Sequence, residues 1–86
     1  PMQKITLKIE GMMCGMCGSH INDAIRRAFP VKRVTSSHSK GETVILNGEP
    51  IPEAELHRVI DPTGYRLLSV SCEPYEKKGL FSRISR

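Results

Sequence analysis

The 86-residue chain has no tryptophan, only two phenylalanines and two tyrosines, and no apolar run long enough to cross a lipid bilayer. Aliphatic side chains must therefore supply most of the core, and a chain of this length has room for a single core. Its three cysteines cannot all pair, which excludes a full disulfide framework. No secretory signal pattern is present, so we expect a cytoplasmic protein without stable membrane insertion.

The charge of the chain is mildly basic, with 13 Lys and Arg residues against 9 Asp and Glu and a net charge of +4. The basic residues are scattered and lack the interleaved aromatic side chains of a nucleic-acid platform. We therefore expect no nucleic-acid partner and interpret the charge as a solvated surface.

The most informative segment is Gly11–Cys17, with the sequence Gly-Met-Met-Cys-Gly-Met-Cys. Before it, Lys4–Glu10 alternates apolar and polar residues, which predicts a half-buried strand. After it, apolar residues recur at helical spacing. Cys14 and Cys17 are therefore predicted on a strand-to-helix turn, where both thiols can reach one soft ion. The helix N-terminus would also favour the thiolate form of Cys17.

The remaining elements follow from similar patterns. Strands are predicted over Val34–His38, Thr43–Leu46 and Tyr65–Cys72, and a helix begins near Pro52. Ser36 and His38 interrupt the apolar face of their strand, which favours an edge position. On the last strand Leu68, Val70 and Cys72 share one face, so we expect Cys72 to be a structural thiol.

The order strand-helix-strand-strand-helix-strand predicts an α+β fold of the split βαβ type, with an antiparallel sheet and both helices on one face. In this topology Gly64 and Tyr65 stand beside Cys14 and Cys17. We assign residues 1–73 to this domain and residues 74–86 to a basic, flexible tail.

The chain resembles the heavy-metal-associated domain family, which includes bacterial copper chaperones and N-terminal domains of metal-transporting P-type ATPases. The matching residues are Gly11, Met12, Cys14 and Cys17 in the pattern Gly-Met-x-Cys-x-x-Cys, with Ile21, Ile60, Gly64 and Tyr65 elsewhere. The resemblance covers roughly residues 3–73 and implies a ferredoxin-like split βαβ fold. It also implies that Cys14 and Cys17 are metal ligands, that Met12 is a buried support for the loop, and that Tyr65 covers the site.

Two thiolates favour Cu(I), which accepts two or three soft ligands, over Zn(II), which takes four in a structural site. Met13, in front of the first cysteine, offers no hard oxygen to zinc. His20 lies about one helical turn after Cys17 and is a possible third ligand. We expect Met13 and Met16 to be surface residues of the loop rather than ligands.

We therefore predict a non-enzymatic Cu(I) chaperone. Its expected partner is a metal-transporting P-type ATPase or a similar Cys-x-x-Cys domain, and two copies could share one ion in a metal-bridged homodimer. Zn(II) is a possible ion instead of Cu(I). Two alternatives stay open: a Zn(II) or Hg(II) binding domain for transport or detoxification, and a glutaredoxin-like thiol redox protein. The redox alternative fits less well because Gly64 and Tyr65 stand where a cis-proline would be needed.

Overall fold

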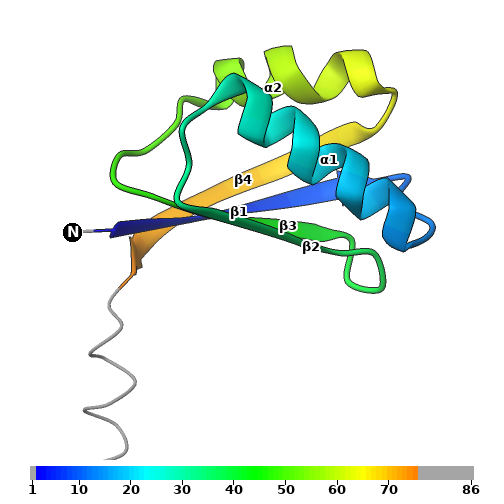
Figure 1. Ribbon diagram of the computed structural model, residues 1–86, viewed down its shortest axis with the longest axis horizontal. Coiled ribbons are helices and arrows are strands. Elements are labelled where there is room, and N and C mark those ends of the chain that lie inside the picture. Colours follow the sequence, from blue (N-terminus) through cyan, green and yellow to red (C-terminus); the bar gives the residue numbers. More distant parts are fainter. Residues whose placement is uncertain (1, 76–86) are drawn as a thin grey trace, which may run out of the picture.

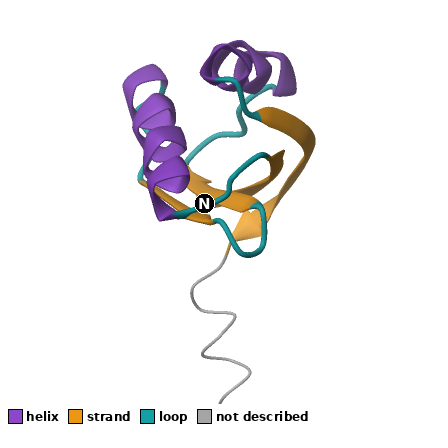
Figure 2. Ribbon diagram, turned by 90° about the vertical axis from the view of Figure 1, so that its right-hand side faces the viewer, coloured by secondary structure: helices purple, strands orange, loops and turns teal. Residues whose placement is uncertain are grey.

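A computed structural model describes residues 2–75, which form a four-stranded antiparallel sheet (Figure 1). The elements are β1 (Met2–Glu10), α1 (Gly15–Ala28), β2 (Arg33–Ser37), β3 (Glu42–Asn47), α2 (Glu53–Ile60), a 3-10 turn (Asp61–Thr63) and β4 (Arg66–Tyr75). The strand order is β2-β3-β1-β4, and both α-helices cover the same face of the sheet (Figure 2). The predicted ferredoxin-like split βαβ fold is confirmed. Within these residues, neither α-helix has the length and apolar character needed to span a membrane.

An aliphatic core fills the space between the sheet and the two helices. Its members are Ile5, Leu7, Ile9, Met12, Ile21, Ile25, Val34, Ile45, Leu56, Ile60 and Leu67. β1 supplies three of them by strict alternation, and each helix supplies two isoleucine or leucine side chains spaced four residues apart. Phe29 and Tyr65 are only partly buried and pack against the margin of this cluster. Aliphatic burial thus replaces the large aromatic side chains that the chain has in short supply.

A register shift between β1 and β4 changes the predicted face of the last strand. Lys8 pairs with Ser69 whereas Ile9 pairs with Leu67, so Leu68 is an extra residue in β4. Such a bulge shifts by one residue the alternation of side chains between the two faces of the sheet. As a result Leu67 is buried and Leu68 is 56% exposed. The prediction that Leu68 lies on the same face as Val70 and Cys72 was wrong.

Cys72 was predicted to be a structural thiol, but it is exposed and is not part of the core. It pairs with the buried Ile5, but β4 is an edge strand with a neighbour on one side only. The Cys72 Sγ instead donates to the Gln3 Oε1 at 3.5 Å. β4 continues to Tyr75, three residues beyond its predicted end. Residues 76–86 of the predicted tail lie outside the described residues, so the division at residue 73 stays a prediction.

Polar contacts hold β2 where the sequence predicted a weak edge strand. Ser36 donates a hydrogen bond of 2.6 Å to the Asn22 Oδ1, and its Oγ lies 2.7 Å from the hydroxyl of the fully buried Thr43. Since Ser36 has one hydroxyl proton, Thr43 is the donor in the second bond. Gly18 of α1 permits this close packing, because a Cβ at that position would lie 3.0 Å from the Ser36 Cβ. His38 follows β2 and is exposed.

Candidate metal centre

The loop between β1 and α1 is fixed by a glycine and a buried methionine. Gly11 has φ +105°, in the left-handed region that side chains with a Cβ rarely adopt. A Cβ there would lie 3.3 Å from the Tyr65 Cδ1, so the loop and Tyr65 are in close contact. Met12 then turns inward and is only 6% exposed within the core. The loop between β1 and α1 is therefore anchored at its first two residues, Gly11 and Met12.

Cys14 and Cys17 lie at the start of α1 with their sulfur atoms 3.7 Å apart. Cys14 is the N-cap residue and is exposed, whereas Cys17 is partly buried, and both are free thiols. The Cys17 amide donates to the Cys14 carbonyl oxygen at 3.1 Å, which closes the first turn around the pair. This separation is short enough for both sulfurs to bind one ion at metal–sulfur bond lengths of about 2.3 Å.

The surroundings of Cys17 favour its thiolate form. Hydrogen bonding from the Tyr65 hydroxyl is the largest cause, followed by the backbone amides of the Met13–Cys14 segment, and together they lower the pKa of Cys17 to about 7. Partial desolvation opposes this shift, and a hydrogen bond with the Cys14 thiol adds a small lowering. The same contact raises the pKa of Tyr65, because the phenol donates to the sulfur only while it keeps its proton. About half of Cys17 is thus ionised near pH 7, at which an ordinary thiol of pKa about 8.5 is mostly protonated.

Tyr65 reaches the cysteine loop through a sharp turn between α2 and β4. The 3-10 turn Asp61–Thr63 ends in Gly64, whose φ of +92° reverses the chain. Thr63 accepts a 3.3 Å hydrogen bond from the Tyr65 amide and donates through the same hydroxyl to the Ile60 carbonyl oxygen. Thr63 therefore positions Tyr65, a role that was not predicted from the sequence. A threonine before a glycine at a helix end is the local signal that could have identified it.

The structure does not gather His20 with the two cysteines. His20 is exposed on α1 and lines an open hollow together with Asp23 and Tyr65. Among residues 2–75, no three side chains of His, Cys, Asp or Glu are grouped closely enough to hold a metal ion. The role of His20 as a third ligand therefore stays a prediction.

The loop also carries two solvent-facing methionines. Met13 is 82% exposed and Met16 is 68% exposed, as expected for surface residues of the loop.

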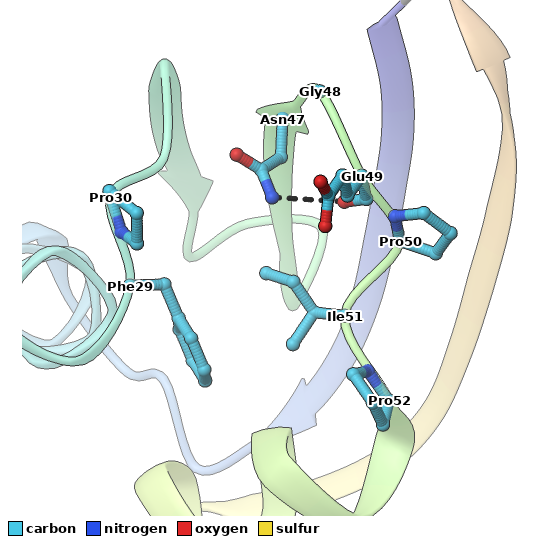
Figure 3. Close-up of a pocket in the computed structure, with 8 residues that line it drawn as sticks. All are labelled: Phe29, Pro30, Asn47, Gly48, Glu49, Pro50, Ile51 and Pro52. Carbon is cyan, nitrogen blue, oxygen red and sulfur yellow. Dashed lines mark hydrogen bonds between the residues drawn. The ribbon is translucent and has the colours of Figure 1, made fainter.

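Another hollow, of about 420 Å³, is lined by residues that follow α1 and β3 (Figure 3). It opens between the end of α1 and the loop from β3 to α2, where the Phe29 and Ile51 side chains face the same space. The Asn47 side chain stabilises this loop by donating to the Glu49 carbonyl oxygen at 2.9 Å. The hollow is lined by no sulfur ligand and is separate from the cysteine pair.

No protein-family model matches the chain. The mercuric reductase of Serratia marcescens is 29% identical over 80 residues, which is 91% of this chain. The chain spans only 17% of the length of that relative.

Solved structures share the fold along most of their length. A candidate copper-ion-binding protein from Bacillus anthracis str. Ames has a TM-score of 0.68 and 25% identity, covering 79% of this chain and 97% of that protein. Oxidized MerP from Ralstonia metallidurans CH34 has a TM-score of 0.69 and 24% identity, covering 83% and 99%. The N-terminal domain of ZntA in its Zn(II) form has a TM-score of 0.66 and 21% identity, covering 77% and 89%. The resemblance to heavy-metal-associated domains that the sequence predicts is confirmed.

Proposed function

We propose that this chain, which has the heavy-metal-associated fold, is a carrier of one Cu(I) ion held by Cys14 and Cys17. The observation that carries the proposal is the pair of free thiols 3.7 Å apart at the start of α1. Cu(I) accepts two or three soft ligands, and the pair supplies two of them. The likeness to a candidate copper-ion-binding protein supports the same ion.

Release of the ion is as important to a carrier as binding. Cys14 is exposed at the start of α1, so a thiolate from a partner can approach an ion held by the pair. A three-coordinate intermediate can then pass the ion on without a step in which it is free. We propose as acceptor a metal-transporting P-type ATPase or another Cys-x-x-Cys domain in the cytoplasm. The chain itself would bind and transfer the ion without catalysing a reaction.

The low pKa of Cys17 supports this role. Thiols must lose their protons to bind a metal, so protons compete with the ion. Since the pKa of Cys17 is about 7, little of that competition remains at neutral pH on this ligand.

A second candidate ion is Hg(II), which the similarity to a mercuric reductase favours. It is a soft cation, and the same two thiolates would hold it. With either ion, the cysteine sulfurs of two copies could surround one metal and produce a bridged dimer. Zn(II) fits less well because a structural zinc site takes four ligands.

The test is an anaerobic titration of the reduced full chain with Cu(I), Hg(II) and Zn(II), each against a competing chelator. We expect one Cu(I) per chain, bound far more tightly than Zn(II) and lost in Cys14→Ser and Cys17→Ser. Cys72→Ser is the matched control, because this thiol is exposed but lies on β4. Weak Cu(I) binding with tight Hg(II) binding would replace the first proposal by the second. The absence of tight binding to any of the three ions would refute both and favour thiol redox chemistry.

A further inference from the structure

We infer that Met13 and Met16 form a thioether capture site that receives Cu(I) ahead of the two thiolates and helps the loop to select Cu(I) over Zn(II). The inference rests on the proposed function, because the ion is passed to Cys14 and Cys17. It assigns a binding role to two side chains that the sequence pattern alone places on the surface.

The structure separates the three methionines of the loop into two groups. Met12 is 6% exposed and packs in the core, whereas Met13 and Met16 are directed to solvent. Among residues 2–75, only three large hydrophobic side chains are exposed, and two of them are these methionines; the third is Leu68 at the bulge. Core packing therefore explains Met12 and leaves Met13 and Met16 without a structural role.

Each exposed thioether is the sequence neighbour of one of the two thiols. Met13 directly precedes Cys14, and Met16 directly precedes Cys17. Neighbouring Cα atoms are about 3.8 Å apart, and the unbranched methionine side chain has three rotatable bonds with which to approach an ion. Cys14 is exposed beside these two exposed methionines, so a third soft ligand of this kind has access to an ion at the pair.

The chemistry of a thioether distinguishes the two metals. Thioether sulfur is a soft ligand suited to Cu(I), whereas zinc sites are built from Cys, His and carboxylate ligands. A thioether also carries no proton, so it binds Cu(I) without the deprotonation that a thiol requires. In the exchange the copper remains Cu(I) and no electrons move. Copper–thioether bonds break as copper–thiolate bonds form, and the thiol protons leave to solvent.

The first test examines the thioethers without the thiols. The full-length triple variant Cys14→Ser, Cys17→Ser and Cys72→Ser, with ¹³C-methyl-labelled methionine, is titrated anaerobically with Cu(I) and followed by NMR. We expect the methyl resonances of Met13 and Met16 to shift, while those of the buried Met12 and of Met2 stay in place. Resonances of Met13 and Met16 that do not move would overturn the inference. Backbone amide spectra before the titration check that the triple variant is folded.

The second test keeps the thiols and removes the thioethers. In the double variant Met13→Leu and Met16→Leu, both substitutions are exposed and preserve side-chain volume, so the fold should be unchanged. We expect the rate of Cu(I) uptake from a chelator to fall by about tenfold or more, with Zn(II) affinity unchanged; Met2→Leu is the matched control. Unchanged Cu(I) uptake and affinity would overturn the inference while the proposed function stands. If the unaltered chain itself does not bind Cu(I) tightly, the proposed function fails instead.

Discussion

Replacement of Tyr65 by phenylalanine should raise the pKa of Cys17, because the Tyr65 hydroxyl is the largest cause of its lowered value. The pKa should move from about 7 toward the ordinary thiol value of about 8.5, with the backbone amides retaining part of the shift. If the whole shift were lost, the thiolate fraction at pH 7 would fall from about one half to roughly 0.03, a loss of about 16-fold, and the retained effect of the backbone amides makes the expected loss smaller than this. The alkylation rate at pH 7 should also fall, but by less than the thiolate fraction, because a thiolate of higher pKa is the stronger nucleophile.

The assay follows iodoacetamide alkylation against pH in a Cys14→Ser, Cys72→Ser background, where Cys17 is the reactive thiol. The Cys14 thiol is the smallest cause of the lowered pKa of Cys17, and Cys14→Ser retains the backbone contribution, so the background preserves most of the effect. Tyr75→Phe is the matched control, since Tyr75 lies at the far end of β4. A midpoint that stays near pH 7 in the Tyr65→Phe protein would refute the assigned role of the hydroxyl.

The lowered pKa of Cys17 also makes the stability of the folded protein depend on pH. The pKa of Cys17 is lower in the folded protein than in an unfolded chain, so its ionisation favours the folded state. This contribution is fully present above the ordinary thiol pKa and is lost as the pH falls through about 7. Denaturant titrations of the metal-free protein should therefore show less dependence on pH across this range in the Tyr65→Phe variant.

Three further substitutions test the fold around the site. Gly18→Ala should destabilise the protein by about 1 kcal/mol in denaturant titration. Overpacking against Ser36 costs about 1–3 kcal/mol, which exceeds the helix-propensity gain of about 1 kcal/mol. An increase in stability would show that α1 can move away from the sheet without cost. Gly64→Ala should cost about 1–2 kcal/mol through its φ of +92° alone, since nothing lies within 4 Å of the added Cβ, and a thermal melt equal to that of the unaltered protein would contradict the strain. Lys8→Gln should raise the pKa of Glu42, because the hydrogen bond and the charge of Lys8 lower that pKa in the unaltered protein. The ionised Glu42 stabilises the fold above the ordinary carboxyl pKa, and this contribution is lost as the pH falls through the pKa of Glu42 in the folded protein. The substitution should therefore reduce this contribution. An NMR titration of the Glu42 carboxyl measures this shift directly, and an unchanged midpoint would assign the effect to other charges.

The element order and the core of β1 could be predicted from the sequence because both depend on local periodicity. The face of β4 could not, because the bulge between Lys8 and Ile9 is a property of strand pairing and not of β4 alone. Two adjacent leucines, Leu67 and Leu68, fit either alternation equally well. The register of the partner strand decides which one is buried.

The hydrogen bonds of the polar residues in β2 could not be predicted from the sequence pattern either. Ser36 interrupts an apolar face in the sequence, yet Asn22 and Thr43 satisfy its hydroxyl in the fold. These three residues are far apart in the chain, so no local window contains the network. Hydrogen bonding across elements makes the position suitable for serine.

The cysteine pair could be predicted because all of its determinants lie within a few residues. The contact between Tyr65 and Cys17 depends on topology, and the order of elements was sufficient to anticipate that these segments meet. The hydrogen bond that lowers the pKa of Cys17 could not be anticipated, because it depends on how the turn at Gly64 orients the ring.

Pairing of Met2 with Tyr75 has a consequence for how this unit can be used in larger assemblies. The first and last described residues lie side by side at one end of the sheet, and β1 spans about 26 Å from there to the cysteine loop (Figure 1). A neighbouring domain joined at either point would leave the loop unobstructed. Rotation about such a joint would sweep the loop through a wide arc. The length of the linker to the neighbouring domain would then determine which acceptor domains the cysteine loop can contact.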